Sequence, residues 1–147
     1  EGEGIVHDIR ERARAIQKEA EQLAVTVPEI ASRFQQRIEK RLHELLGEAP
    51  VDPQRTLQEA AILADRTDIS EELQRLKAHT ERLLEMLDGD AELGKQVDFL
   101  AQELNRETNT MLSKTTPLGQ EGLQFTDSAL RVKAEIEKIR EQAQNLE

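Results

Sequence analysis

The sequence predicts an all-α fold, in which one long, kinked N-terminal helix and several shorter helices form an antiparallel helical bundle. Three observations predict it. Apolar residues recur at alternating steps of four and three in both terminal segments, which is the helical period. Ala, Leu, Glu, Lys and Arg supply about half of the chain, as in proteins built from long helices. No segment shows the alternation of a strand.

The first helix is predicted from an apolar seam of one long segment, and Gly47 to Pro50 ends it. The seam comprises Ile9, Ala13, Ile16, Ala20, Leu23, Val27, Ile30 and Phe34, and it continues through Ile38, Leu42 and Leu45. Pro28 lies inside it, and Thr26 with Glu29 resembles a capping box, so a break into two helices is the alternative. The seam keeps its phase across Pro28, which favours one kinked helix. Such a seam is not buried by itself, so we expect it to pack on the last helix or on another subunit, with oligomerisation completing the bundle.

The shorter helices are predicted from caps and spacing. Asp52 and Pro53 begin a helix that runs to about Asp65, with Leu57, Ala60, Ala61 and Ala64 on its inner face. Asp68 caps a helix that runs to about Leu87, and Asp88–Asp90 is a turn. The next helix covers residues 93–114, a loop containing Pro117 covers 115–122, and the last helix is carried by Val132, Ile136, Ile139, Ala143 and Leu146.

Composition excludes several classes of function. The chain has no cysteine and therefore no disulfide, thiolate metal site or cysteine nucleophile. It has no apolar run of about 18 residues, so we expect no membrane span. Neither a phosphate-cradling glycine loop nor an HExxH zinc motif is present. The acidic, cysteine-free composition suits a cytoplasmic protein.

Polar residues on two of the predicted helices form the candidate site. Asp68, Glu72, Arg75 and His79 follow 4-3-4 spacing on one helix; Asp98, Gln102, Asn105 and Asn109 follow it on the next, whose other flank carries Glu103, Glu107 and Lys114. If these helices pack antiparallel, their flanks face a common groove, where carboxylates and an imidazole could bind a divalent cation. Arg66, Arg75, Arg106 and Lys114 would then hold phosphates.

The alternative is that these groups are structural. Charged pairs at i,i+4 are usually solvated ion pairs worth about 0.2–0.5 kcal/mol each. A lone histidine such as His79 is more often a surface or packed residue than a ligand. The basic residues Arg33, Arg37, Lys40 and Arg41 could follow a nucleic-acid backbone, but at a net charge of -10 they are also explained as one exposed helix face.

Three segments resemble the YicC/YloC-type endoribonucleases. They are RTLQE from Arg55, RTDISEELQRLKAH from Arg66 to His79, and DFLAQELNRETNTMLSK from Asp98 to Lys114, followed by KIREQAQNLE at the end of the chain. The resemblance implies an intracellular protein that cleaves RNA with a divalent cation, Mg²⁺ or Mn²⁺, and that forms a ring-like homo-oligomer such as a hexamer. It also implies that residues 1–49 are a linking, coiled-coil-like helix, that residues 50–147 are the C-terminal helical domain, and that the N-terminal domain of the family is absent here.

The resemblance assigns roles by residue. Glu72, His79, Glu103 and Glu107 match as metal or acid–base candidates, with Glu103, Glu107 and His79 as catalytic groups. Arg66, Arg75, Arg106 and Lys114 would neutralise phosphate charge. The alternative function is a non-catalytic module for oligomerisation and RNA clamping, with the cleaving residues in the missing N-terminal domain.

Overall fold

The computed structural model describes residues 2–47, 52–89 and 93–146, and within them every regular element is helical. The elements are α1 (Gly2–Leu46), α2 (Pro53–Arg66), α3 (Ser70–Leu87), α4 (Leu93–Thr115), the 3₁₀ segment η1 (Thr116–Gly122) and α5 (Leu123–Ala143). The predicted all-α class is therefore confirmed. None of the described helices is long and apolar enough to cross a membrane.

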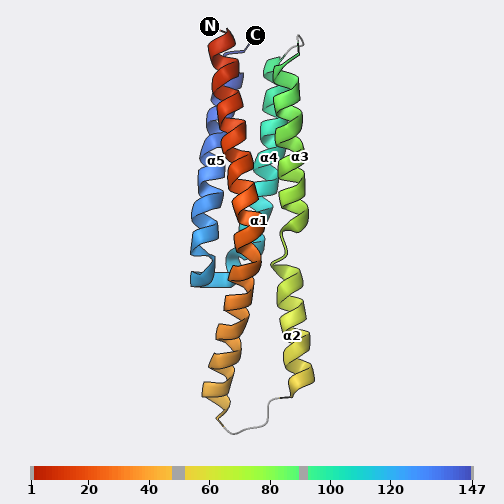
Figure 1. Ribbon diagram of the computed structural model, residues 1–147, viewed down its shortest axis with the longest axis vertical. Coiled ribbons are helices and arrows are strands. Elements are labelled where there is room, and N and C mark those ends of the chain that lie inside the picture. Colours follow the sequence, from red (N-terminus) through yellow and green to blue (C-terminus); the bar gives the residue numbers. More distant parts are fainter. Residues whose placement is uncertain (1, 48–51, 90–92, 147) are drawn as a thin grey trace.

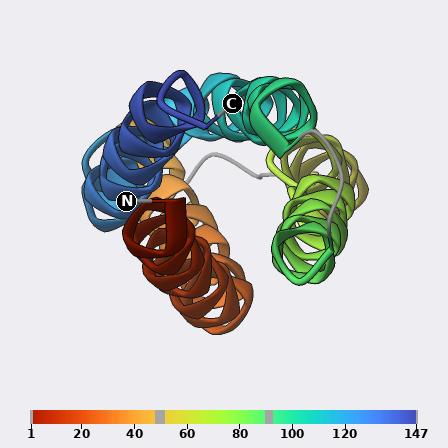
Figure 2. The same ribbon diagram turned by 90° about the horizontal axis from the view of Figure 1, so that it is seen from above.

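Four of the helices form an antiparallel bundle. α1 packs on α3 and α5, and α4 packs on the same two helices from the opposite side (Figure 1). Seen along the bundle axis, the order around the bundle is α1, α5, α4 and α3 (Figure 2). The prediction that the first helix packs on the last is confirmed.

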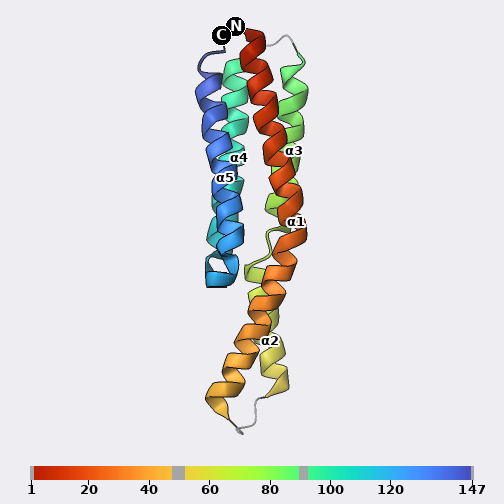
Figure 3. The ribbon, with the colours of Figure 1, turned by 60° about the vertical axis from the view of Figure 1, so that its left-hand side comes forward.

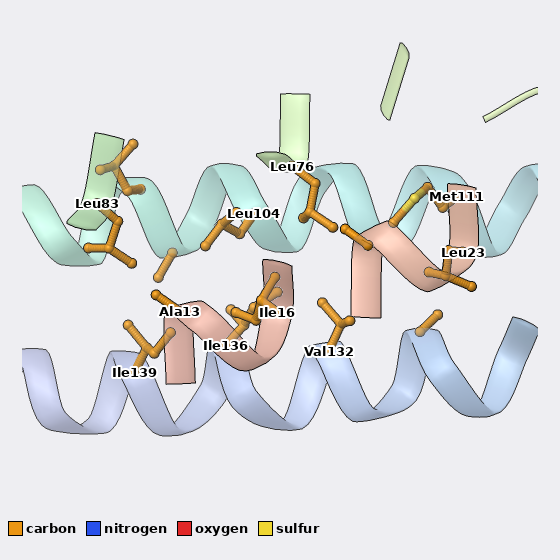
Figure 4. Close-up of a cluster of buried hydrophobic side chains, with 14 of the residues drawn as sticks. Ala13, Ile16, Leu23, Leu76, Leu83, Leu104, Met111, Val132, Ile136 and Ile139 are labelled. Carbon is orange, nitrogen blue, oxygen red and sulfur yellow. The ribbon is translucent and has the colours of Figure 1, made fainter. Parts of the chain in front are cut away.

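The predicted apolar seams meet in the bundle core. The seam of α1 is buried from Ile9 to Ile30, and that of α5 is buried from Val132 to Ala143 and continues in Leu146 just after the helix. Figure 4 shows side chains of α1, α3, α4 and α5 pointing toward one another, among them Ile16, Leu104 and Ile136. Each large aliphatic side chain removed from water in this way contributes about 1.5–3 kcal/mol, so the core supplies the main stabilisation of the bundle.

Helix α1 is one continuous helix through Pro28, as predicted. The hydroxyl of Thr26 donates to the carbonyl of Gln22 at 3.0 Å, so Thr26 is a helix-interior residue and the alternative of a capped break is wrong. The ring of Pro28 is exposed, and the core residues Val27 and Ile30 lie on the buried face.

Beyond the bundle, the second half of α1 and helix α2 extend together as an arm (Figures 1 and 3). Ile38, Leu42 and Leu45 continue the α1 seam there but are exposed. The predicted inner face of α2 is wrong, because Leu57 is 70% exposed and Ala61 and Ala64 are exposed as well. Among the described residues α2 makes at most marginal contacts with other elements, so its apolar residues find no core within this chain.

The caps and connections follow the sequence with two differences. Asp52 accepts a hydrogen bond from the backbone N–H of Gln54 at 3.1 Å, with Pro53 in the first turn, as predicted. Asp68 accepts a hydrogen bond from the N–H of Ser70 at 3.0 Å, but the N-cap of α3 is Ile69, so the predicted cap at Asp68 is wrong by one residue. The predicted loop at 115–122 is wrong: α4 continues to Thr115, and η1 follows because Leu118 is buried against the bundle. Helix α1 ends at Leu46 and Gly47 follows it with φ 58°, as predicted. Residues 48–50 with the predicted domain boundary, the turn residue Asp90 and the side chain of Ala60 lie outside what the structure describes.

Candidate functional site

The candidate site joins the first turn of α3 to the last turns of α4. Glu72 lies on the buried flank of α3 and is only 2% exposed, and Glu107 lies on the facing flank of α4 and is 6% exposed. Two carboxylates are seldom buried this deeply unless cations compensate their charge. The antiparallel packing of α3 on α4 brings those cations from both helices.

Two cations pair with the buried carboxylates. Lys114 donates from Nζ to Oε1 of Glu72 at 2.5 Å and to the backbone carbonyl of Asp68 at 3.3 Å. Arg75 places Nε 2.9 Å from Oε1 of Glu107, and its Nη2 lies 3.8 Å from Oε1 of Glu72. We call Glu72, Arg75, Glu107 and Lys114 the α3–α4 cluster; its formal charges sum to zero.

The cations of the α3–α4 cluster face solvent while its acids do not. The side chain of Arg75 is 47% exposed and that of Lys114 is 35% exposed. The hydrogen bond to Glu72 raises the pKa of Lys114, and the hydrogen bond to Glu107 raises the pKa of Arg75. Both side chains therefore stay charged at neutral pH and present N–H donors at the surface, which is the arrangement that contacts a phosphate.

One carboxylate oxygen of the cluster is buried without a hydrogen-bond partner among the described residues. Oε2 of Glu72 is buried and, among the described residues, accepts no hydrogen bond. A buried carboxylate oxygen without a partner costs free energy, and such atoms in native proteins usually mark an ion, a water molecule or a functional role. Oε2 of Glu72 can therefore accept a further ligand.

The other predicted site residues lie outside the cluster. Glu103 lies one turn before Glu107 on α4, and its nearest ionic partner is Arg106 of the same helix, at 3.9 Å. His79 is half-buried on α3, and Arg66 is exposed in the last turn of α2. Within the described residues, no group of three or more His, Asp or Glu side chains is placed to hold a metal ion. The four predicted ligands are therefore brought together only in part.

The second polar stripe of α4 faces a different helix from the one expected. Asp98 accepts a hydrogen bond from Nε of Arg140 at 3.3 Å, and Asn109 accepts one from Nζ of Lys133 at 2.8 Å, both across the α4–α5 interface. Helical spacing shows that these residues flank the apolar face but not which neighbour they meet. The expectation of one common groove is thus right for Glu107 and Lys114 and wrong for this stripe.

Most of the chain is similar in sequence to a known protein family. Residues 23–147 match the family described as "Endoribonuclease YicC-like, C-terminal". This chain belongs to that family. It is 36% identical over 148 residues to a protein named "Probable endoribonuclease YicC" from Clostridioides difficile, and 36% identical over 147 residues to a protein of the same name from Haemophilus influenzae. The alignments take in 100% of this chain and 49% of each relative, so the chain spans about half the length of the curated relatives it matches.

Proposed function

We propose that this chain is the C-terminal helical region of an endoribonuclease and that the α3–α4 cluster lies where RNA is cleaved. The main observation behind this proposal is a pair of half-exposed cations, Arg75 and Lys114, each of which is paired with a buried carboxylate. The relatives' names supply the reaction class, which is cleavage of internal phosphodiester bonds in RNA.

Charge balance supports a cation in the proposed site. The α3–α4 cluster is neutral, whereas a bound phosphodiester carries a negative charge. During cleavage, additional negative charge develops on the phosphate oxygens. A site that stabilises such charge needs a positive excess. Arg106, at the surface of α4, is the nearest further cation along that helix, and its side chain is 73% exposed.

The residues fit a divalent cation that is held jointly with substrate. Mg²⁺ is commonly bound by one or two carboxylates together with waters and substrate phosphates. Glu72 and Glu107 offer two carboxylates from two helices, and Oε2 of Glu72 has no protein donor among the described residues. A Mg²⁺ or Mn²⁺ ion would supply Lewis-acid polarisation of the phosphate and a more acidic bound water.

The chain's own residues have separate roles in this proposal. Lys114 and Arg75 bind and orient phosphate oxygens through charged N–H donors. Glu72 and Glu107 fix those cations and offer oxygen ligands, so we treat them as positioning residues as well as candidate ligands. Glu103 and His79 complete the predicted set of site residues. Because they lie outside the cluster, they could act only on a ligand or substrate that extends beyond it.

A second function is favoured by a specific observation. Both buried acids already carry ion-pair partners, and the described residues hold no three-acid group for a metal. This balance suits a clamping module that binds RNA and associates with other copies, while the cleaving residues lie in the half of the relatives that this chain does not cover. The exposed Ile38, Leu42 and Leu45 of the arm are apolar surface that a homo-oligomer would bury.

One experiment separates the two functions. Labelled RNA is incubated with Mn²⁺ or with EDTA, and with either this chain alone or this chain joined to the remaining half of the Clostridioides difficile relative. Cleavage that needs the metal and falls in Lys114→Met supports the first proposal. Binding without cleavage by the chain, together with cleavage by the joined protein that survives Lys114→Met, supports the clamping module. Light scattering on the same samples tests the homo-oligomer.

A further inference from the structure

A groove outside the α3–α4 cluster lies where the arm begins. It runs between the second half of α1 and η1 and has a volume of about 680 Å³. From α1 it is lined by Phe34, by the cations Arg37, Lys40 and Arg41 and by the acid Glu44, and from η1 by Leu118 and Gly119. We call this hollow the α1–η1 groove. It contains three of the four basic residues, Arg37, Lys40 and Arg41, that the sequence offered either as contacts to a nucleic-acid backbone or as an exposed helix face.

The groove owes its shape to the turn at Gly119. This residue has φ 57° and ψ −132°, a backbone conformation that only glycine adopts readily. The turn lets Leu118 point into the core, where it is 1% exposed, while Gly119 stays at the surface as part of the groove wall. No atom lies within 4 Å of the position that a Cβ would take at Gly119, so the space beside its backbone is open.

Positive charge is concentrated along the α1 wall. Arg37, Lys40 and Arg41 are all exposed, and Arg33 lies one turn before Arg37 on the same helix. Arg37 reaches across to Glu121 at 3.4 Å, and Arg41 lies 3.8 Å from Glu44, both at the surface. Exposed pairs of this kind are weak and exchange readily for another anion. A cluster of four cations is notable in a chain with a net charge of -10.

An aromatic ring lies beside these cations. Phe34 is half-buried, so part of its ring remains accessible within the groove. Proteins that bind single-stranded nucleic acid combine a basic groove that follows the phosphates with aromatic rings on which bases stack. The α1–η1 groove holds both elements within two turns of one helix.

The groove lies at the same end of the bundle as the α3–α4 cluster. Lys114 is in the last turn of α4, η1 begins two residues later, and Glu72 is in the first turn of α3. Figures 1 and 3 show that this end of the bundle is the one from which the arm extends. A strand held in the groove would therefore be bound at the end of the molecule where cleavage is proposed.

We propose that the α1–η1 groove binds the backbone of single-stranded RNA, with Arg37, Lys40 and Arg41 on its phosphates and a base stacked on Phe34. The inference rests on the proposed function, because it takes RNA as the ligand. It adds a binding surface that needs no metal ion. Binding in EDTA therefore reports on the groove separately from the cluster.

The test measures fluorescence anisotropy of a labelled 12-nucleotide oligouridine in EDTA over a range of salt concentrations. Lys40→Glu/Arg41→Glu is expected to weaken binding at least about tenfold and to reduce the salt slope by about 1.4, since single strands contribute about 0.7 per phosphate. Phe34→Leu keeps an apolar side chain and is expected to weaken binding about fivefold or more with the slope unchanged. Circular dichroism confirms that the variants are folded.

The matched control is Arg14→Glu/Lys18→Glu. It lies on the same helix, changes the net charge equally, and also includes an arginine with a surface glutamate partner, Glu11 at 3.6 Å. At 1.5 Å per residue, Lys18 lies about 33 Å from Lys40 along the helix, several times the Debye length of about 8 Å at physiological salt. The control is expected to bind within about threefold of the unmodified chain, because screening removes its effect on the groove.

Three results would overturn the groove proposal. Equal weakening by both double variants would mean that net charge alone governs binding. Failure of the unmodified chain to bind RNA in EDTA would remove the groove, yet metal-dependent cleavage by that same chain would leave the proposed function intact. Tighter binding of a glutamate-rich helical peptide than of RNA, lost in Lys40→Glu/Arg41→Glu, would make the groove a docking site for protein.

Discussion

Lys114 and Glu72 join the last turn of α4 to the first turn of α3 through a hydrogen bond of 2.5 Å between Nζ and Oε1. The carboxylate is 2% exposed, while the ammonium group is on a side chain that is 35% exposed. The buried negative charge of Glu72 is therefore compensated by an ammonium group that lies near the surface. Arg75 approaches the same oxygen at 3.8 Å, too far for a hydrogen bond, so Lys114 is its principal partner.

Removing Lys114 should destabilise the fold. Lys114→Met leaves the buried Glu72 carboxylate without its hydrogen-bond donor, and we expect the free energy of unfolding to fall by about 1–3 kcal/mol, measured by urea denaturation. Lys138→Met, at an exposed site on α5, is the control and should change stability by less than about 0.5 kcal/mol. The double variant Glu72→Gln/Lys114→Met should lose less than the sum of its single changes. Strict additivity would contradict the pairing.

A methyl group at Gly94 should be poorly tolerated. A Cβ there would lie 2.4 Å from the carbonyl oxygen of Leu146 and 3.0 Å from that of Ala143, because α4 begins against the end of α5. Gly94→Ala should cost about 1–3 kcal/mol of unfolding free energy, since backbone atoms must move apart. Gly4→Ala meets no atom within 4 Å and should be neutral or stabilising by up to about 1 kcal/mol. Thermal unfolding of both variants checks the opposite signs.

Glu19 should make stability depend on pH. It accepts hydrogen bonds from Nε of Arg131 at 2.9 Å and from the hydroxyl of Ser128, joining α1 to α5. The Arg131 hydrogen bond, with a smaller contribution from Ser128, lowers the pKa of Glu19 against the opposing effect of burial. A lowered pKa means that the folded state favours the carboxylate, so this stability is present above the ordinary value of 4.5 and is lost as pH falls through the lowered one.

The measurement compares Glu19→Gln with the unmodified chain by urea denaturation between pH 7 and pH 3. The stability difference should be about 0.5–1 kcal/mol at pH 7 and should shrink below pH 4.5. Glu137→Gln, at an exposed site on α5, is the matched control for the change from Glu to Gln. A difference that grows on acidification would show that the pKa is shifted in the opposite direction.

The apolar residues of α2 should contribute little to folding within one chain. Leu57 is 70% exposed and Ile62 is 45% exposed, so Leu57→Ser should change the unfolding free energy by less than about 0.5 kcal/mol. Leu104→Ala, at a fully buried site of α4, should cost about 2–5 kcal/mol. Both free energies of unfolding are to be measured at a protein concentration at which light scattering shows a monomer. A cost above about 1 kcal/mol for Leu57→Ser would indicate that α2 packs on another part of the chain.

Helical period predicted the bundle well because local and tertiary requirements agree there. The apolar residues that share one face of α4 are all buried, namely Val97, Leu100, Ala101, Leu104 and Met111, and the apolar stripe of α5 is buried as well. The same reasoning fails for α2 because a stripe shows only which residues share a face. Whether Leu57 meets a partner depends on where the neighbouring helices end. Helix α2 lies in the arm, beyond the end of the bundle (Figure 1).

The candidate site was predicted in part for a similar reason. Spacing placed Glu107 and Lys114 on one flank of their helix, and antiparallel packing then brought them to Glu72 and Arg75. Spacing could not show that Asp98 and Asn109 face α5, since that depends on how α4 is oriented in the bundle. Residue type also does not predict the burial of Thr80. Its hydroxyl donates to the carbonyl of Lys77 at 2.8 Å, and this hydrogen bond lets a polar residue lie on the apolar face.

The central claim is that the α3–α4 cluster carries the cleavage of RNA, and the most direct measurement is the cleavage rate of Glu107→Gln in Mn²⁺. This change keeps the size of a buried side chain but removes the charge that Arg75 pairs with at 2.9 Å. With folding verified by circular dichroism, the claim predicts a rate about 100-fold or more below that of the unmodified protein. A rate within about threefold of the unmodified protein would contradict the claim.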